Sequence, residues 1–491
     1  MPSPADRPDP PRTALRAGAI LGASVTFAVV GLAALGHALF GWANPAYGLF
    51  EWVSRILPGS VVTYGIDQVV RLVRALGVGS TASAAKVVEQ VLAILLAIGG
   101  GAVAGAAIAA VSRARRPHVG REAGVGREDV GAREGPRRRG VLAGLAGAAA
   151  GIGALGFGLS RWLTGRREPA AASGALEVGG TSGPAASPPE ATLAARWAPV
   201  PGTRPELTSN EDFYRVDINL TPPSVDEASW RLEISGLVRQ PQALSLDELR
   251  ARPAVSQIIT LECISNPVGG DLIGTSRWTG MRVADLLRDV GVGAGARALA
   301  FEAADGFHES ATIEEVSDPR ALLVYAMNGE PLPVEHGFPL RLYIPDRHGM
   351  KLPKWIRRID LVDQARPGYW VERGWSATAI PHTTSVIDTI RATGAGDQRR
   401  LSVGGIAYAG ARGISKVEVQ IDDGPWRPAQ LRTPPLGPLT WVQWRLDGTY
   451  TPGRHTVRVR AYDGTGAPQE VAVQPPHPSG ATGIDQKAAR V

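Results

Sequence analysis

The sequence predicts a mixed α+β domain, an all-β sandwich that follows it, and an α-helical membrane anchor that precedes both. Three observations support this order. Three long uncharged runs lie in the first third of the chain, helix caps then alternate with short apolar runs, and only short alternating strands with turn signals follow Trp375. A chain of 491 residues is also too long for one hydrophobic core, so we expect several domains.

The membrane anchor is expected over residues 1–165, with three transmembrane helices at 17–42, 90–112 and 140–160. Each run is long enough to cross a hydrocarbon core of about 30 Å. The apolar stretch 59–77 also contains charged residues, which favours an amphipathic interfacial helix over a fourth span. Both interpretations of that stretch stay open.

Arginine placement predicts the orientation of the anchor, because basic flanks stay in the cytoplasm. The segment 112–139 holds nine arginines against four acidic residues, so we expect it inside. Three spans then place everything after Arg161 outside, which predicts a multi-pass protein of the cell membrane with an extracytoplasmic catalytic domain. The pair Arg138-Arg139 is similar to a twin-arginine export signal or is simple flanking charge. The only histidine of the predicted spans is His37, so a haem between paired histidines is excluded there.

Residues 166–205 are rich in Ala, Gly, Ser and Pro and are expected to be a flexible linker. The α+β domain is expected over 206–375. Its elements follow in order as a strand at 230–234, a capping box that opens a helix at Ser245-Leu-Asp-Glu248, a strand at 257–264, a helix at 282–290, a strand at 298–303, a second cap at Thr312-Ile-Glu-Glu315, a turn at Asn328-Gly329 and a strand at 339–344.

The region 376–485 lacks helix signals and is expected to form the β-sandwich. Val417, Val419 and Ile421 alternate with polar residues before the turn signal Asp422-Asp-Gly424, and the same pattern returns at 457–461. Short alternating strands separated by turns are typical of a two-sheet domain of about 100 residues.

Cys263 is the only cysteine of the chain, so it cannot form an intrachain disulfide. It is therefore a small buried hydrophobic residue, a reactive thiol or a metal ligand. Outside the cytoplasm a free thiolate would be oxidised unless a soft metal bound it. Zinc-type cysteine pairs, a phosphate-binding Gly-Lys-Ser/Thr loop and a haem attachment motif are absent from the sequence. The excess positive charge is concentrated in one loop, so nucleic acid is not an expected partner.

Several motifs in the right order resemble the sulfite-oxidase family of molybdenum-cofactor enzymes across residues 207–485. They are Phe213-Tyr-Arg215, Thr260-Leu-Glu-Cys-Ile-Ser-Asn266, Ser276-Arg-Trp-Thr-Gly280, Tyr325-Ala-Met-Asn-Gly-Glu-Pro-Leu-Pro333, His336-Gly-Phe-Pro-Leu-Arg341 and Gly349-Met-Lys-Leu-Pro-Lys-Trp355. The segments Gly405-Ile-Ala-Tyr-Ala-Gly410 and His477-Pro-Ser-Gly-Ala-Thr-Gly483 are similar to that family's immunoglobulin-like dimerisation domain.

The resemblance implies that Cys263 is the protein's ligand to molybdenum in a molybdenum–molybdopterin cofactor. It implies that the pterin phosphate is held by His336, Arg341 and Lys354, with help from Lys351 and from backbone amides near Gly349. Arginine and lysine suit a buried phosphate chemically. A structural ion pair is the alternative for His336 and Arg341.

The resemblance also implies that Arg215 faces the metal and its anionic substrate, the alternative being a surface arginine. Sulfite-oxidising members carry two arginines where this chain has Pro267 and Val268, and a tyrosine where it has Trp375. Loss of charged donors weakens binding of a small anion first. Oxidation of sulfite itself is therefore doubtful, and Trp375 is expected to line the substrate site.

The resemblance thus implies an oxidoreductase that transfers an oxygen atom to or from a small oxo compound, in a membrane-anchored homodimer formed through the C-terminal domain. Haem and iron–sulfur motifs are absent, so a separate electron carrier is expected. One alternative is a reductase of S-oxides or N-oxides, such as methionine sulfoxide. The others are a cofactor-free binding or scaffold protein on the same fold and a cysteine hydrolase, which would need a base near Cys263.

Overall fold

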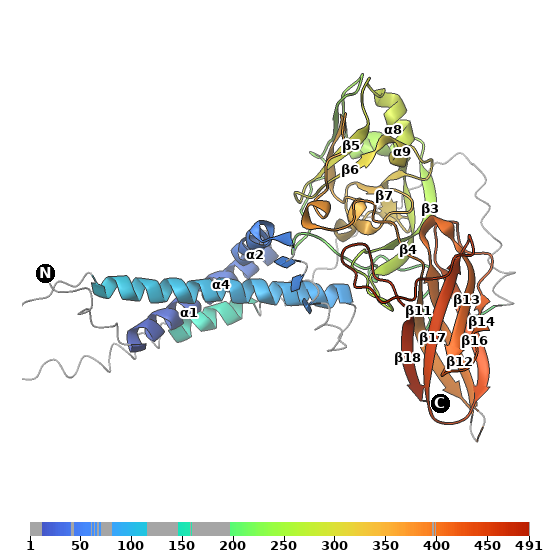
Figure 1. Ribbon diagram of the computed structural model, residues 1–491. Coiled ribbons are helices and arrows are strands. Elements are labelled where there is room, and N and C mark those ends of the chain that lie inside the picture. Colours follow the sequence, from blue (N-terminus) through green and yellow to red (C-terminus); the bar gives the residue numbers. More distant parts are fainter. Residues whose placement is uncertain are drawn as a thin grey trace, which may run out of the picture. The chain divides into compact units, whose positions relative to one another are not determined.

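The chain forms two compact units in the structure, which is a computed structural model (Figure 1). The first unit contains residues 1–57 and 85–172, and the second contains 58–84 and 173–491. The structure describes residues 12–40, 44–59, 61–62, 64–65, 68–69, 81–114, 146–157, 159, 197–394, 397 and 399–490. Most of the stretch 59–77, the basic segment from 115 to 139 with the Arg138-Arg139 pair, and the predicted linker up to residue 196 lie outside the described residues.

The first unit is helical, as its uncharged runs predict. Its helices are α1 (Arg12–Phe40), α2 (Pro45–Ile56), α4 (Thr81–Ala114) and a shorter helix at Ala146–Phe157. Two segments within them, Leu15–Gly36 and Lys86–Ser112, are long and apolar enough to cross a membrane. The third predicted span, 140–160, is described as a helix only over its central part. Helix α2, which the sequence analysis missed, begins at Pro45 behind the cap residue Asn44.

Glycines bring the helices of this unit into close contact. A Cβ atom at Gly22 would collide with the carbonyl oxygen of Gly101, and one at Gly105 would collide with that of Gly18, so α1 and α4 pack backbone to backbone. Such pairs of small residues four apart are typical of packed membrane helices. The helix at Ala146–Phe157 also contacts α1, where Phe157 stacks on Phe27 with ring centroids 5.6 Å apart.

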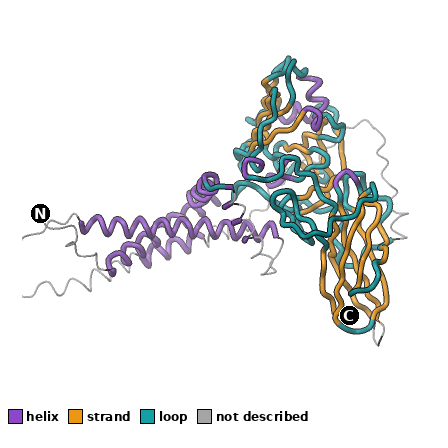
Figure 2. The backbone as a smooth tube through the Cα atoms, in the orientation of Figure 1, coloured by secondary structure: helices purple, strands orange, loops and turns teal. Residues whose placement is uncertain are grey.

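The second unit begins with an α+β region built on two sheets (Figure 2). Strands in the first run in the order β2-β1-β10-β5-β6, namely Gln242–Leu244, Leu232–Gly236, Ile356–Val362, Ala298–Ala303 and His308–Thr312. Strands in the second run in the order β3-β4-β7-β8, with β9 also on β7, namely Val255–Glu262, Ile273–Arg282, Leu322–Met327, Glu330–Pro331 and Arg341–Tyr343. Helices α7 (Leu246–Arg250), α8 (Val283–Val290) and α9 (Ile313–Val316) connect the strands. One large core of buried side chains includes residues of both sheets.

Both predicted capping boxes are present in this region. The Ser245 hydroxyl accepts from the backbone N–H of Glu248, whose carboxylate accepts from the backbone of Ser245, and Thr312 and Glu315 repeat the arrangement at α9. Each cap satisfies backbone donors that a helix start leaves free.

The C-terminal part is a sandwich of two four-stranded sheets around one core. The first sheet has the order β11-β12-β16-β15, namely Thr384–Thr393, Arg399–Tyr408, Val442–Tyr450 and Gln430–Leu431. The second has the order β14-β13-β17-β18, namely Arg427–Pro428, Ile414–Ile421, Arg454–Asp463 and Asp485–Arg490. The predicted domain end at residue 485 is therefore too early, because β18 begins there and pairs with β17. The immunoglobulin-like class of this sandwich stays a prediction.

The predicted linker, 166–205, also ends too late. Val200 is buried, the carbonyl oxygen of Pro201 accepts hydrogen bonds from Thr389 and Arg391, and the guanidinium of Arg204 pairs with Asp388 at 2.7 Å. Residues 198–205 thus pack on the sandwich, although their composition is typical of a linker.

Candidate active site

Cys263 lies directly after β3, in a well-fixed turn. Its backbone N–H donates to the carbonyl of Leu272 at 3.0 Å, and its Sγ lies 3.0 Å from the hydroxyl oxygen of Ser265. The side chain is buried against Leu272 and Tyr214. Burial raises the pKa of the Cys263 thiol, whereas the positive charge of Lys354 acts in the opposite direction. A nearby cation is what a thiolate ligand needs.

The strand that leads to the thiol is held by the C-terminal sandwich. The Thr260 N–H donates to the carbonyl of Leu439 at 2.9 Å, its carbonyl accepts from the Tyr408 hydroxyl at 3.1 Å, and its Oγ1 accepts from the backbone of Trp441 at 2.8 Å. Both domains therefore determine where Cys263 lies.

Glu262 and Asn266, two polar residues of the cysteine motif, hold the turn that carries the thiol. The Asn266 amide donates to the buried Glu262 carboxylate at 2.9 Å, and its oxygen accepts from the Leu272 backbone at 3.0 Å, which closes the turn around the thiol. Burial raises the pKa of Glu262 to about 7. His348, before Gly349, is 3.2 Å from the carbonyl of Glu262 through Nδ1, which we assign as the donor. Its buried Nε2 has no hydrogen-bond partner among the described residues.

His336, Arg341 and Lys354 form one cluster, as the family resemblance implies. His336 ends the short 3-10 helix η2 (Val334–His336), and its Nε2 donates to the carbonyl of Asn210 at 2.8 Å. Arg341 opens β9, donates to the carbonyl of His336 at 3.0 Å and lies over the Trp278 ring at 4.8 Å. Burial lowers the pKa of His336 to about 4 and that of Arg341 to about 10.

One buried carboxylate, Asp217, forms ion pairs with Lys354 of this cluster and with Arg215. It accepts from Lys354 Nζ and from Arg215 Nε, and its side chain has no exposed surface. Burial lowers the pKa of Lys354 to about 8, and the nearby charges of Arg341 and Arg215 act in the same direction. With His336 neutral, the cations Lys354, Arg341 and Arg215 outnumber the nearby buried carboxylates Asp217 and Asp305, which leaves an excess of positive charge. A phosphate would offset this buried excess charge, so these residues fit the predicted group.

Arg215 was expected to face the metal, but the structure places it with the phosphate-binding candidates. Its guanidinium donates to Asp217 and to the carbonyl of Leu220 at 3.3 Å. Its neighbour Tyr214 instead packs against Cys263. The sequence analysis missed Tyr214, although it stands between the two named residues of the motif Phe213-Tyr-Arg215.

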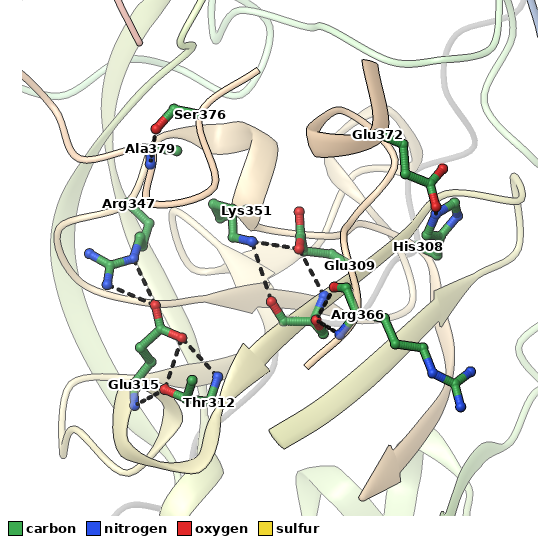
Figure 3. Close-up of polar contacts among 11 residues, drawn as sticks. His308, Glu309, Thr312, Glu315, Arg347, Lys351, Arg366, Glu372, Ser376 and Ala379 are labelled. Carbon is green, nitrogen blue, oxygen red and sulfur yellow. Dashed lines mark hydrogen bonds and ion pairs between the residues drawn. The ribbon is translucent and has the colours of Figure 1, made fainter. Parts of the chain in front are cut away.

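Gly349 and Lys351 lie on the 3-10 turn η3 (Gly349–Lys351) but face different surroundings. A Cβ at Gly349 would be 3.2 Å from the Tyr214 hydroxyl, which places this turn beside the thiol. The Lys351 ammonium donates to Glu309 at 2.5 Å and to the carbonyl of Ser310 at 3.3 Å, as Figure 3 shows. Lys351 also lines a separate pocket of about 700 Å³. It is thus engaged by a buried carboxylate, away from the Asp217 cluster.

Trp375 is buried next to the cysteine motif. It packs with Ile264 and Met350, and the ring of His477, from a loop of the sandwich, meets it edge-on at 5.0 Å. The Trp375 Nε1 atom is buried and has no partner among the described residues. The predicted site residues therefore form a thiol centre with Trp375 beside it and a cation cluster around Asp217.

Comparisons with known proteins identify the family of the α+β region. Residues 219–370 match the model of the oxidoreductase molybdopterin binding domain family. The chain is 31% identical over 182 residues to the uncharacterized oxidoreductase YuiH of Bacillus subtilis, covering 37% of this chain and 88% of YuiH. It is 30% identical over 309 residues to the sulfite oxidase of Gallus gallus, covering 53% of this chain and 65% of that enzyme.

A further relative is an Azospira oryzae protein, YedZ1, named as a putative protein-methionine-sulfoxide reductase subunit. It is 36% identical over 152 residues, which cover 31% of this chain and 56% of YedZ1. The chain thus spans less than two thirds of the length of YedZ1 and of the Gallus gallus enzyme. The fold resembles the sulfane dehydrogenase SoxCD of Paracoccus pantotrophus, with a TM-score of 0.51 and 22% identity over 58% of this chain and 82% of that one. The buried thiol, its motif and these matches together show that the chain belongs to the sulfite-oxidase family of molybdopterin-binding oxidoreductases.

Proposed function

We propose that this protein is a membrane-anchored molybdenum-cofactor oxidoreductase that transfers an oxygen atom to or from a small sulfur or nitrogen oxo compound. The observation that carries the proposal is the pairing of a fixed, buried thiol with a cluster of buried cations in excess over their carboxylates. Cys263 would be the protein ligand of the metal. The bound cofactor supplies the two-electron redox chemistry, and the protein positions it and tunes the surrounding charge.

The cation cluster would hold the pterin phosphate through Arg341, Lys354 and His336. Asp217 keeps Lys354 and Arg215 in place, so the cluster is preorganised for an anion. Backbone groups at Gly349 are close enough to Tyr214 and the cysteine turn to contribute to the same site. Lys351 takes no part in this set, because Glu309 engages its ammonium.

A neutral S-oxide or N-oxide is the favoured substrate of this proposed reaction. Pro267 and Val268 follow the cysteine motif without a cationic side chain, Arg215 is tied to Asp217, and the indole of Trp375 packs beside the site. An uncharged substrate fits this environment better than the sulfite dianion. The relative YedZ1 is named as a putative subunit of a protein-methionine-sulfoxide reductase, which supports methionine sulfoxide as one such substrate.

The apolar helices would anchor the enzyme, with the catalytic unit on the outer face and electrons exchanged with a separate carrier. A homodimer through the sandwich is part of the same proposal. The arginine-rich segment 112–139 supports the orientation.

Metal and pterin analysis of the purified protein and of Cys263→Ser tests the proposal. We expect one molybdenum per chain in the natural protein. In the serine variant we expect no turnover and an altered sulfur-to-metal absorption band. A protein that purifies without molybdenum would instead be a scaffold, and a serine variant with normal turnover and spectrum would remove Cys263 from the site.

A further inference from the structure

Tyr214 has a fixed ring at the thiol centre. It packs with Cys263 and Leu272 and stacks on Phe213, with centroids 5.3 Å apart and an interplanar angle of 22°. Phe213 is itself held edge-on by Trp278 and by His336, each at 5.4 Å. The aromatic neighbours of the cation cluster therefore fix the direction of the Tyr214 ring.

The Tyr214 hydroxyl is able to form a hydrogen bond, but no described residue is bonded to it. It makes no hydrogen bond to any described residue, although it lies beside the turn at Gly349 and the side chain is half-buried. A phenol both donates and accepts, so this hydroxyl can bond to solvent or to a bound substrate. A phenol carries its proton at physiological pH, so the group is a neutral O–H donor.

The phenol of the family's tyrosine is absent, and the guanidinium expected near the thiol is already bonded within the protein. Trp375 replaces the family's tyrosine with an indole whose N–H is buried. The Arg215 guanidinium bonds to Asp217 and Leu220. Tyr214 is thus the described side chain that presents an unused hydroxyl next to Cys263.

We propose that Tyr214 supplies the phenolic donor of the active site and that its O–H donates to the oxygen of a neutral S-oxide or N-oxide held beside the Cys263 sulfur. This inference rests on the proposed function and narrows its substrate class. A neutral donor stabilises an uncharged oxygen by an ordinary hydrogen bond, whereas a small dianion needs the charged donors that this site lacks.

Binding of dimethyl sulfoxide to the loaded enzyme tests the inference through the sulfur-to-molybdenum absorption band. In Tyr214→Phe we expect a dissociation constant about 2- to 13-fold higher, which is the loss of one neutral hydrogen bond. Dimethyl sulfide lacks the oxygen, so its dissociation constant should not change. Molybdenum and pterin content should also stay at the natural level.

Tyr408→Phe is the matched control. Its hydroxyl donates to the carbonyl of Thr260, so this variant also removes one phenol that contacts the strand leading to Cys263. We expect it to bind dimethyl sulfoxide normally, because Thr260 keeps its hydrogen bonds to Leu439 and Trp441 and these hold the strand in place. Equal weakening in both variants would show a displaced strand rather than a lost donor and would overturn the inference.

Two other results would also reject it. Unchanged dimethyl sulfoxide binding in Tyr214→Phe would show that the hydroxyl does not meet the substrate, while the proposed function would stand on the metal content. Loss of molybdenum from Tyr214→Phe would assign the phenol to the cofactor instead. Absence of molybdenum from the natural protein would refute the proposed function itself, so the two failures are distinguishable.

Discussion

Arg341→Met should have different effects on the loaded and the cofactor-free protein. The side chain is buried, and its guanidinium makes one recorded hydrogen bond, to the His336 carbonyl, within the described part of the chain. Methionine preserves much of the length but removes the charge and the donors. If Arg341 holds a phosphate, the loss should appear in cofactor retention.

The expected magnitude follows from hydrogen bonds to charged groups, which contribute about 1.5–3 kcal/mol each. Loss of one such bond should weaken cofactor retention roughly 10- to 150-fold. In the cofactor-free protein Arg341→Met should not lower the stability, because burial lowers the pKa of Arg341 from its usual range to about 10. The buried charge therefore costs up to about 3 kcal/mol, so its removal should not destabilise the empty protein.

The assay compares molybdenum and pterin content and thermal unfolding of both forms, the empty form being made in cells that lack pterin synthesis. The control is Arg320→Met, whose guanidinium pairs with Asp318 at 2.7 Å outside the cluster and whose loss should leave cofactor content unchanged. A fully loaded Arg341→Met protein would refute the assignment. So would an empty variant that loses as much stability as the loaded one.

Three further predictions concern other parts of the chain. Glu262→Gln should raise the free energy of unfolding of the cofactor-free protein above pH 7 by at most about 3 kcal/mol. Burial raises the pKa of Glu262 from 4.5 to about 7, so the native state binds an extra proton between these pH values and stability falls as pH rises through this range. The gain in the variant should therefore vanish below pH 4.5 in urea titrations. Gly22→Ala should destabilise the helical unit in detergent, since its Cβ would collide with the Gly101 carbonyl. Gly100→Ala is the control, because this position has open space around it and alanine should stabilise the helix by up to about 1 kcal/mol. Equal melting temperatures of the two variants would contradict the glycine contact. Reporter fusions within the segment 112–139 should behave as cytoplasmic and fusions just after the third predicted span as external, and the reverse pattern would overturn the three-span topology.

Local signals predicted the secondary structure of the second unit well. The helix expected at 282–290 is found at Val283–Val290, and the strand at 298–303 is found as β5, because caps and alternation depend on neighbouring residues alone. The end of the linker was wrong because Ala- and Pro-rich composition does not reveal that Val200 finds a surface to pack on.

The sequence motifs predicted which residues form the site, but not where their side chains point. The motifs indicated the residues around Cys263, yet they could not show that Tyr214 turns toward the thiol while Arg215 turns toward Asp217. Side-chain direction depends on the local backbone path, which the sequence pattern of an irregular loop does not specify. Asp217 belonged to no motif, and its role depends on Arg215, two residues before it, and on Lys354 from a distant segment.

The hydrogen bonds between Thr260 and the sandwich determine which fragments of the chain can keep the site intact. A truncated chain that stops near residue 376 would lose the three sandwich partners of Thr260 and the ring of His477 that packs on Trp375. Strand β3, which leads to the thiol turn, would then be paired with β4 alone and its other edge would be exposed. A fragment limited to residues 206–375 is therefore a poor choice for expression, drug screening or domain grafting, and the shortest useful soluble form should run from about residue 197 to Arg490.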